Sequence, residues 1–312
     1  MRISFALFPF TAFLGLASCN VAKKMEHATT KSFAKSELVA HTFTDAGGPH
    51  KVWSSAALST NKKPKLMLVH GIMSSSGMWA GDVGRLSDDY DLIVPDLIGH
   101  GGSTGQWSGN SVEAQISHLV GILDSLGVRE PVFVVGNSYG GAIVANLAEK
   151  HPERVRVLVI GDGPASDYTA AMADSVARSV GAKDITALFT PTNNDEQYRL
   201  MSLVFFDPPK IPGFALKQMN QNMAKQRAGH LALLQDLLKR ESEYATKKYR
   251  WTMPTYVLWG EGDRLIPLST GRGIMRRNNL PADHLIIIPK AGHGPNLEQP
   301  KVFAKELKRI LK

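Results

Sequence analysis

A serine stands between two glycines in the stretch 136–141, whose sequence is GNSYGG. Apolar residues 132–135 precede the stretch and a helix-like run follows it, so we expect a sharp turn from a buried strand into a helix. Side chains at positions 136 and 140 would collide with the strand and the helix in so tight a turn. The pattern predicts that Ser138 is a catalytic nucleophile, and the alternative is a glycine-rich loop capped by a serine.

A serine hydroxyl becomes a strong nucleophile when a base removes its proton and an acid orients that base. Further along the chain, Asp263 follows the strand-like run 255–259, and His293 follows the run 284–288. The carboxyl ends of parallel strands lie at one edge of a sheet. We therefore expect Ser138, His293 and Asp263 to meet at that edge as nucleophile, base and acid.

Two other carboxylates remain open as the acid. Glu261 lies two positions before Asp263, and Asp162 follows another strand-like run, residues 155–160. Both are therefore compared with Asp263 below.

The attack on a carbonyl group places negative charge on its oxygen, which needs two hydrogen-bond donors. One donor is expected to be the backbone N–H of Tyr139, because it begins the helix that follows Ser138. The second is expected from the loop after the strand-like run 65–70, which continues as Gly71-Ile72-Met73.

The elements that must position these residues alternate between strand-like and helix-like patterns. The strand-like runs are short and rich in Val, Ile and Leu, as in parallel strands that are buried on both faces. They cover residues 51–58, 65–70, 91–95, 132–136, 155–160, 255–259 and 284–288. Helical spacing of apolar residues lies between them, for example at 112–123 and 302–310. The alternation predicts an α/β fold with a doubly wound, mostly parallel sheet.

The long segment between residues 160 and 255 has no strand pattern but several amphipathic helical stretches. A simple crossover between parallel strands needs only about a dozen residues, so the segment must form an additional unit. We expect residues 164–250 to be a helical cap, inserted after the sixth strand into a core of residues 37–163 and 251–312.

From Lys51 to the C-terminus the chain resembles the α/β-hydrolase superfamily. The motifs that carry the resemblance are the His-Gly pair at 70–71, the turn at 96–103, the elbow at 136–141, and the sequences WGEGD at 259–263 and GH at 292–293. The resemblance implies that Ile72 supplies the second oxyanion N–H. It also implies structural roles for Asp96 and His100, and for His70 a structural hydrogen bond under the loop, with a second base as the alternative.

The elbow form Gly-Asn-Ser-x-Gly-Gly occurs in two branches of that superfamily. One comprises serine esterases and lipases, including monoacylglycerol-lipase-like bacterial lipases, and the other comprises carbon–carbon hydrolases of ring-fission products. The second branch usually carries Gly-Pro soon after the His-Gly pair, where this chain has Met73-Ser74. The resemblance therefore favours an esterase or lipase that hydrolyses small-molecule or lipid esters.

The expected substrate carries an apolar acyl group, and no metal or organic cofactor is implied. Candidates to line an acyl pocket are residues 203–206 and Phe214 of the cap, although each is also a candidate for the cap's own core. A competing hypothesis is a lipid-anchored envelope protein that keeps the fold without turnover. The complete set of catalytic positions argues against it.

The N-terminus reads as a secretory signal. An apolar run at 3–17 follows Met1-Arg2 and is too short to span a bilayer, which takes about 20 apolar residues. Residues 16–19, with the sequence LASC, resemble the bacterial lipobox, which predicts a signal peptide at 1–18 and a diacylglyceryl group on Cys19. The alternative is an ordinary cleaved signal with an incidental cysteine.

Residues 19–36 are then expected to be a lipidated flexible tether to a membrane surface in the bacterial cell envelope. Asn20 is not the aspartate that holds many lipoproteins at the inner membrane, so the outer membrane is favoured.

The composition sets limits on the class of protein. The chain has 312 residues, of which 43% are hydrophobic and 21% charged, values typical of a globular protein with a substantial core. A single cysteine excludes an internal disulfide and any zinc site built on paired thiolates. The net charge of +8 is concentrated near both ends, which indicates an anionic surface nearby rather than a nucleic-acid groove.

Overall fold

A computed structural model describes residues 21–45, 47–58, 62–104 and 111–312. Its centre is an eight-stranded sheet in the order β1-β2-β4-β3-β5-β6-β7-β8. The strands are β1 (Leu38–Asp45), β2 (Gly48–Ser55), β3 (Lys65–Val69), β4 (Asp91–Pro95), β5 (Val132–Asn137), β6 (Val155–Gly161), β7 (Thr255–Gly260) and β8 (Leu285–Ile288). From β4 to β8 all neighbours are parallel, whereas β1 and β2 pair antiparallel at one edge.

Strand β1 was not among the predicted strands. It forms a hairpin with β2 at the edge of the sheet, and only Leu38 among its eight residues is fully buried. An edge strand with exposed polar residues has no run of apolar residues, which is the feature that identified the central strands.

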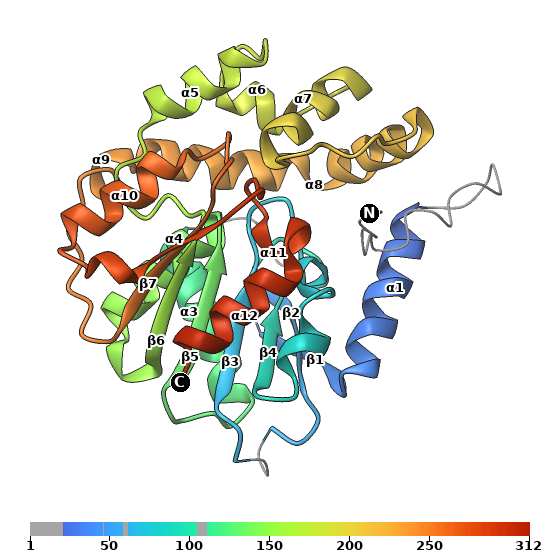
Figure 1. Ribbon diagram of the computed structural model, residues 1–312. Coiled ribbons are helices and arrows are strands. Elements are labelled where there is room, and N and C mark those ends of the chain that lie inside the picture. Colours follow the sequence, from blue (N-terminus) through green and yellow to red (C-terminus); the bar gives the residue numbers. More distant parts are fainter. Residues whose placement is uncertain (1–20, 46, 59–61, 105–110) are drawn as a thin grey trace, which may run out of the picture.

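Helices cover both faces of the sheet, because successive side chains of a strand point to opposite faces. In β3, Leu66 and Leu68 pack against one cluster of buried residues, and Met67 and Val69 against another. The first face is covered by α1 (Val21–Lys35), α2 (Val83–Leu86) and α12 (Pro300–Ile310), and the second by α3 (Val112–Ser125), α4 (Tyr139–Lys150) and α10 (Leu268–Arg277) (Figure 1). The part of the chain outside the cap also contains four short helical turns: η2 (Ser76–Trp79), η3 (Pro152–Arg154), η4 (Ala282–His284) and α11 (Pro295–Glu298).

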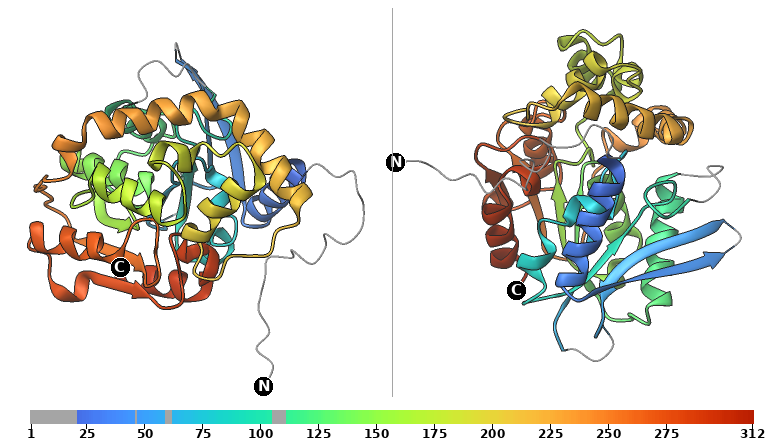
Figure 2. Two further views of the ribbon diagram at one scale, coloured as in Figure 1. Left: turned by 90° about the horizontal axis from the view of Figure 1, so that it is seen from above. Right: turned by 90° about the vertical axis from the view of Figure 1, so that its right-hand side faces the viewer.

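Five helices lie between β6 and β7 and form the cap. They are α5 (Ala170–Ser179), α6 (Ile185–Phe189), α7 (Asn194–Val204), α8 (Gly213–Lys239) and α9 (Glu241–Tyr244). Figures 1 and 2 show the long helix α8 crossing above the carboxyl ends of the strands, with α5, α6 and α7 over it. The predicted α/β class, with a mostly parallel sheet and a helical cap inserted after the sixth strand, is confirmed.

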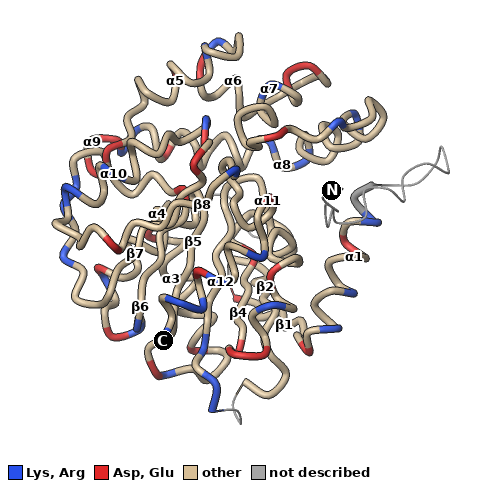
Figure 3. The backbone as a smooth tube through the Cα atoms, viewed as in Figure 1, with Lys and Arg blue, Asp and Glu red and all other residues tan. Residues whose placement is uncertain are grey.

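The prediction of a flexible tether over residues 19–36 is wrong for its described part, because Val21–Lys35 form helix α1. Phe33 is fully buried, and its ring lies 5.0 Å from that of Trp53 in an edge-to-face arrangement. The Ser32 hydroxyl donates to the carbonyl oxygen of Ala80 at 2.5 Å. Burial of one large aromatic residue thus anchors a lysine-rich helix to the body (Figure 3).

The predicted signal peptide, residues 1–18, and Cys19 lie outside the described residues. None of the helices in the part of the chain that the structure describes combines the length and apolar character needed to cross a bilayer.

Candidate active site

Ser138 lies at a sharp turn between β5 and α4. Its backbone has φ 57° and ψ −124°, a strained conformation for a residue with a side chain. Only 7% of the residue is exposed. A Cβ atom at Gly136 would lie 2.3 Å from the carbonyl oxygen of Gly140, and one at Gly140 would lie 2.5 Å from that of His70. The two glycines therefore permit the turn that presents Ser138 at the end of the strand.

His293 and Asp263 are hydrogen-bonded to each other on the loops after β8 and β7. The distance from His293 Nδ1 to Asp263 Oδ2 is 2.8 Å, and the aspartate side chain is fully buried. The other oxygen of Asp263 accepts from the backbone N–H groups of Leu265 and Ile266, both at 2.9 Å. A neutral histidine that donates from Nδ1 keeps an electron pair on Nε2, so it can accept a proton there.

Asn137, the residue before the serine, connects the elbow to the histidine loop. Its side-chain amide donates to the carbonyl oxygen of His293 at 3.1 Å and to a carboxylate oxygen of Asp162 at 3.3 Å. The N–H of Ser138 in turn donates to the carbonyl oxygen of Gly161 at 2.8 Å. The structure thus brings the loops of Ser138, Asp263 and His293 together at one edge of the sheet.

The two alternative acids have other surroundings. Asp162 is fully buried and accepts the backbone N–H of Gly260 at 2.8 Å, so it supports the end of β7. Burial and the neighbouring Asp263 raise the pKa of Asp162 well above its usual value, which disfavours its charged form. Glu261 is exposed and accepts the N–H of Lys290 at 3.2 Å.

The loop after β3 passes directly against the serine. A Cβ atom at Gly71 would lie 2.9 Å from the Cβ of Ser138, and Ile72 follows immediately. Tyr139 is the first residue of α4, so its N–H belongs to the helix N-terminus. Tyr139 thus follows the serine directly in the chain, and Gly71, the neighbour of Ile72, approaches the serine from the loop after β3.

Two buried histidines hold this loop in place. His100 Nε2 accepts the N–H of Met73 at 3.2 Å, and His70 Nε2 accepts that of Leu97 at 3.0 Å while its Nδ1 donates to the carbonyl oxygen of Gly71. Burial lowers the pKa of both rings, so both stay neutral and can accept these bonds. Their contacts are structural, as expected.

Asp96 has a similar structural position. One carboxylate oxygen accepts the N–H of Ser76 at 2.6 Å, and the other accepts that of Gly102 at 2.8 Å. Asp96 thereby joins the loop after β3 to the loop after β4.

Sequence reasoning missed Glu298, which fastens the cap to the histidine loop. Its carboxylate accepts the N–H of Gly292 at 2.6 Å and that of Phe206 at 3.0 Å. The N–H of His293 donates to the carbonyl oxygen of Val204 at 2.7 Å, and Arg264 donates to that of Phe205 at 2.6 Å. No sequence motif marks these bonds, because they join segments that are far apart along the chain.

Apolar side chains lie near the histidine loop. Phe206 is 44% exposed and Leu297 is 47% exposed, and each packs beside a glycine of the loops that carry Asp263 and His293, Gly262 and Gly294 respectively. Phe214 at the start of α8 is also exposed, whereas Leu203 is buried in the main core.

Among the described residues, no group of three or more His, Cys, Asp or Glu side chains could hold a metal ion. The described arrangement consists of a hydrogen-bonded histidine–aspartate pair on loops that meet the strained turn at Ser138, which begins helix α4.

Comparisons with known proteins give hydrolases as relatives. Lipase 3 of Moraxella sp. (strain TA144) is 26% identical over 277 residues, which cover 88% of this chain and 85% of the lipase. The 2-hydroxymuconate semialdehyde hydrolase of Pseudomonas putida is 28% identical over 256 residues, covering 78% of this chain and 86% of that enzyme. A solved structure from Acinetobacter baumannii AYE, provisionally named a lipase, has a TM-score of 0.79 at 21% identity and covers 95% of this chain and 98% of that one.

The model of the alpha/beta hydrolase fold family matches residues 64–300, which include strands β3 to β8, the cap and the residues of the candidate site. The chain therefore belongs to the alpha/beta hydrolase fold family.

Proposed function

We propose that the protein is a serine hydrolase that cleaves carboxylic esters with apolar acyl groups. Ser138 is the nucleophile, His293 the base, Asp263 the acid that orients it, and the N–H groups of Ile72 and Tyr139 bind the oxyanion. The observation that carries this proposal is the 2.8 Å bond between His293 and Asp263, on a loop that Asn137 ties to the strained turn at Ser138.

In the first half-reaction, His293 Nε2 takes the proton of the Ser138 hydroxyl as the oxygen bonds to the ester carbon. The carbonyl oxygen becomes negative and is stabilised by the two backbone donors. The bond to the alcohol then breaks, and His293 gives its proton to the departing oxygen. The products are an acyl group on Ser138 and a free alcohol.

In the second half-reaction, water takes the place of the alcohol. His293 removes a proton from water while the water oxygen bonds to the acyl carbon, and the Ser138 oxygen leaves with that proton. Asp263 keeps the imidazole in one orientation throughout, because two backbone N–H groups fix its second carboxylate oxygen.

The preference for apolar acyl groups is supported by Phe206 and Leu297, which expose apolar surface beside the loops that carry Asp263 and His293. The lipase relative supports the same substrate class. Membrane attachment through Cys19, in the outer membrane of a cell envelope, is part of the proposal and accords with a lipid ester as substrate.

A second candidate is hydrolysis of carbon–carbon bonds in ring-fission products. It is supported by the Pseudomonas putida relative, whose name states that chemistry and whose identity of 28% is similar to that of the lipase. Both reactions would use the same serine, histidine and oxyanion donors, so only the substrate separates them.

The deciding experiment compares kcat/KM for p-nitrophenyl esters of increasing chain length with the rate for a ring-fission dienone. Each buried methylene contributes about 0.8 kcal/mol, so kcat/KM should rise with chain length and then fall when the pocket is full. Ser138→Ala is the control, and it should lose about 10⁴-fold or more of the rate. Flat, slow ester rates together with rapid cleavage of the dienone would establish the second candidate instead.

A further inference from the structure

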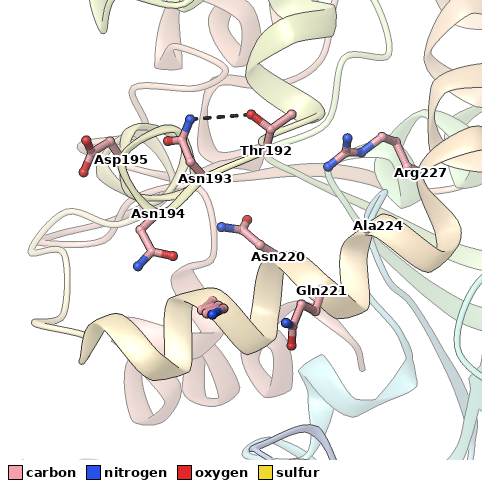
Figure 4. Close-up of a pocket in the computed structure, with 9 residues that line it drawn as sticks. Thr192, Asn193, Asn194, Asp195, Asn220, Gln221, Ala224 and Arg227 are labelled. Carbon is pink, nitrogen blue, oxygen red and sulfur yellow. Dashed lines mark hydrogen bonds between the residues drawn. The ribbon is translucent and has the colours of Figure 1, made fainter.

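The cap contains a polar pocket of about 540 Å³ between the start of α7 and the N-terminal half of α8. Figure 4 shows residues from the two elements facing each other across it. The side chain of Asn194 donates to the carbonyl oxygen of Gly213 at 3.1 Å, which joins the first turns of the two helices. The pocket is thus a built feature of the cap, with walls that are bonded to each other.

One polar group in this pocket has no protein partner. Asn220 is 8% exposed, and its carbonyl oxygen Oδ1 is buried without a hydrogen bond. Figure 4 shows the amide of Asn220 directed into the space between α8 and residues Thr192 and Asn193. A buried acceptor without a partner is costly, typically by about 1–3 kcal/mol, so a donor from a ligand would be favoured there.

The pocket also carries charges of both signs. Lys217 and Arg227 line it from α8, and Asp195 lines it from α7. One guanidinium nitrogen of Arg227 donates to the carbonyl oxygen of Pro191 at 2.6 Å, which fixes this cation at the pocket wall. The two cations suit an anion, whereas Asp195 and Asn220 Oδ1 suit a cationic or neutral donor.

We propose that this pocket binds a phosphate ester that also bears a hydrogen-bond donor, such as a phosphoethanolamine group. The phosphate faces Lys217 and Arg227, and the ammonium group faces Asp195 and Asn220. Such a group occurs as a lipid head group and as a free metabolite. Helix α1 contacts α8, and the proposed lipid anchor precedes α1, so the lipid head group is the source that the structure favours.

The test measures binding of O-phosphoethanolamine and phosphocholine by titration calorimetry to the full chain carrying Ser138→Ala, so that turnover plays no part. The two probes share the phosphate but differ in the N–H donors. Phosphoethanolamine should bind at least about tenfold more tightly, because phosphocholine cannot donate to Asn220 or Asp195. Asn220→Leu should remove this preference, and Lys217→Gln should weaken both probes.

Lys225→Gln is the matched control, because Lys225 is an exposed lysine of α8 that does not line the pocket. Thermal unfolding shows whether each variant is folded, and the exposed Lys217 provides a variant that does not disturb buried contacts. Absence of saturable binding to the parent protein, or an unchanged preference in folded Asn220→Leu, would overturn the proposal.

The source is identified by flotation with vesicles of phosphatidylcholine, with and without phosphatidylethanolamine. An increase with phosphatidylethanolamine that Asn220→Leu abolishes supports the lipid head group. Binding of the free probe without any difference between the vesicles supports the same pocket with a soluble phosphate ester as its ligand. Neither result depends on ester hydrolysis, so a failure of this binding proposal can be distinguished from a failure of the proposed hydrolase function.

Discussion

At the scale of single residues, two buried aspartates end neighbouring strands but have opposite surroundings. Asp263 receives two backbone N–H bonds and contacts His293, whereas burial and the neighbouring Asp263 raise the pKa of Asp162 and disfavour its charged form. A carboxylate that orients an imidazolium must be ionised, and a protonated carboxyl resembles an amide in shape and polarity.

We therefore expect Asp263→Asn to lower kcat by about 10⁴-fold and Asp162→Asn to lower it by less than about tenfold. Ester hydrolysis by both variants is measured in one assay, with Glu261→Gln as an exposed control. A larger loss for Asp162→Asn than for Asp263→Asn would show that the acid has been assigned to the wrong strand.

Asp82 is another buried carboxyl, and its side-chain partner is Asn296 of α11. Asn296 donates to one of its oxygens at 3.0 Å, and the other oxygen is buried without a partner, as is Oδ1 of Asn296. Burial raises the pKa of Asp82 from 3.8 to about 8. The unfolded chain releases this proton near pH 4 while the folded chain retains it, so stability declines as the pH rises from about 4 to about 8.

Asp82→Asn should remove this decline, since an amide pairs with Asn296 without any proton to lose. The variant should be more stable than the parent protein at pH 8, by an amount that grows by up to about 1.4 kcal/mol for each pH unit above 4. Urea unfolding between pH 4.5 and 8.5 measures this difference, with exposed Asp283→Asn as control. Stability curves that stay parallel across this range would contradict the prediction.

At the scale of elements, the segment after α7 is bonded to the loop that carries His293. The carboxylate of Glu298 accepts N–H groups from Gly292 and Phe206, and the N–H of His293 reaches Val204. The position of the histidine thus depends on α11 and on the end of a cap helix, as well as on β8.

Glu298→Gln replaces one acceptor oxygen with a donor that cannot accept these bonds. We expect kcat/KM to fall by about tenfold or more, mainly in kcat if His293 shifts and mainly in KM if the segment at Phe206 shifts. Steady-state kinetics with a matched Glu306→Gln variant, at a glutamate of α12 that is paired with Arg309, provides the comparison. Unchanged kinetics in a folded Glu298→Gln protein would exclude a positioning role.

At the scale of the whole molecule, helix α1 bears on how closely a lipid anchor on Cys19 would hold the folded body to a membrane. Cys19 lies two positions before α1, whose buried Phe33 packs the helix on the body. An acylated Cys19 would then hold the body close to the bilayer, and the lysines that lie along α1 (Figure 3) would add attraction to anionic head groups.

We expect Cys19→Ser to move the protein from the membrane fraction to the soluble fraction, because acyl chains contribute about 0.8 kcal/mol per buried methylene. Cell fractionation and labelling with a radioactive fatty acid measure this. Asn20→Asp keeps the cysteine and should shift the protein toward the inner membrane. Cys19→Ser protein that remains fully membrane-bound would refute the lipid anchor.

Local sequence was sufficient for the elements whose formation depends on neighbouring residues. The glycine spacing around Ser138 and the apolar runs of the central strands are local properties, so the strand-turn-helix at the elbow and the central strands could be predicted from them. The same patterns left three carboxylates as candidates for the acid that orients His293, and all three lie near strand ends.

Only the tertiary structure decided which of these carboxylates contacts His293, because burial and partners arise from segments that are distant in the chain. The same holds for the edge hairpin of β1, whose exposed residues have no apolar pattern, and for α1, which is fixed by the contact of Phe33 with Trp53. Glu298 gave no sequence signal at all, since its partners are backbone groups, which every residue type carries.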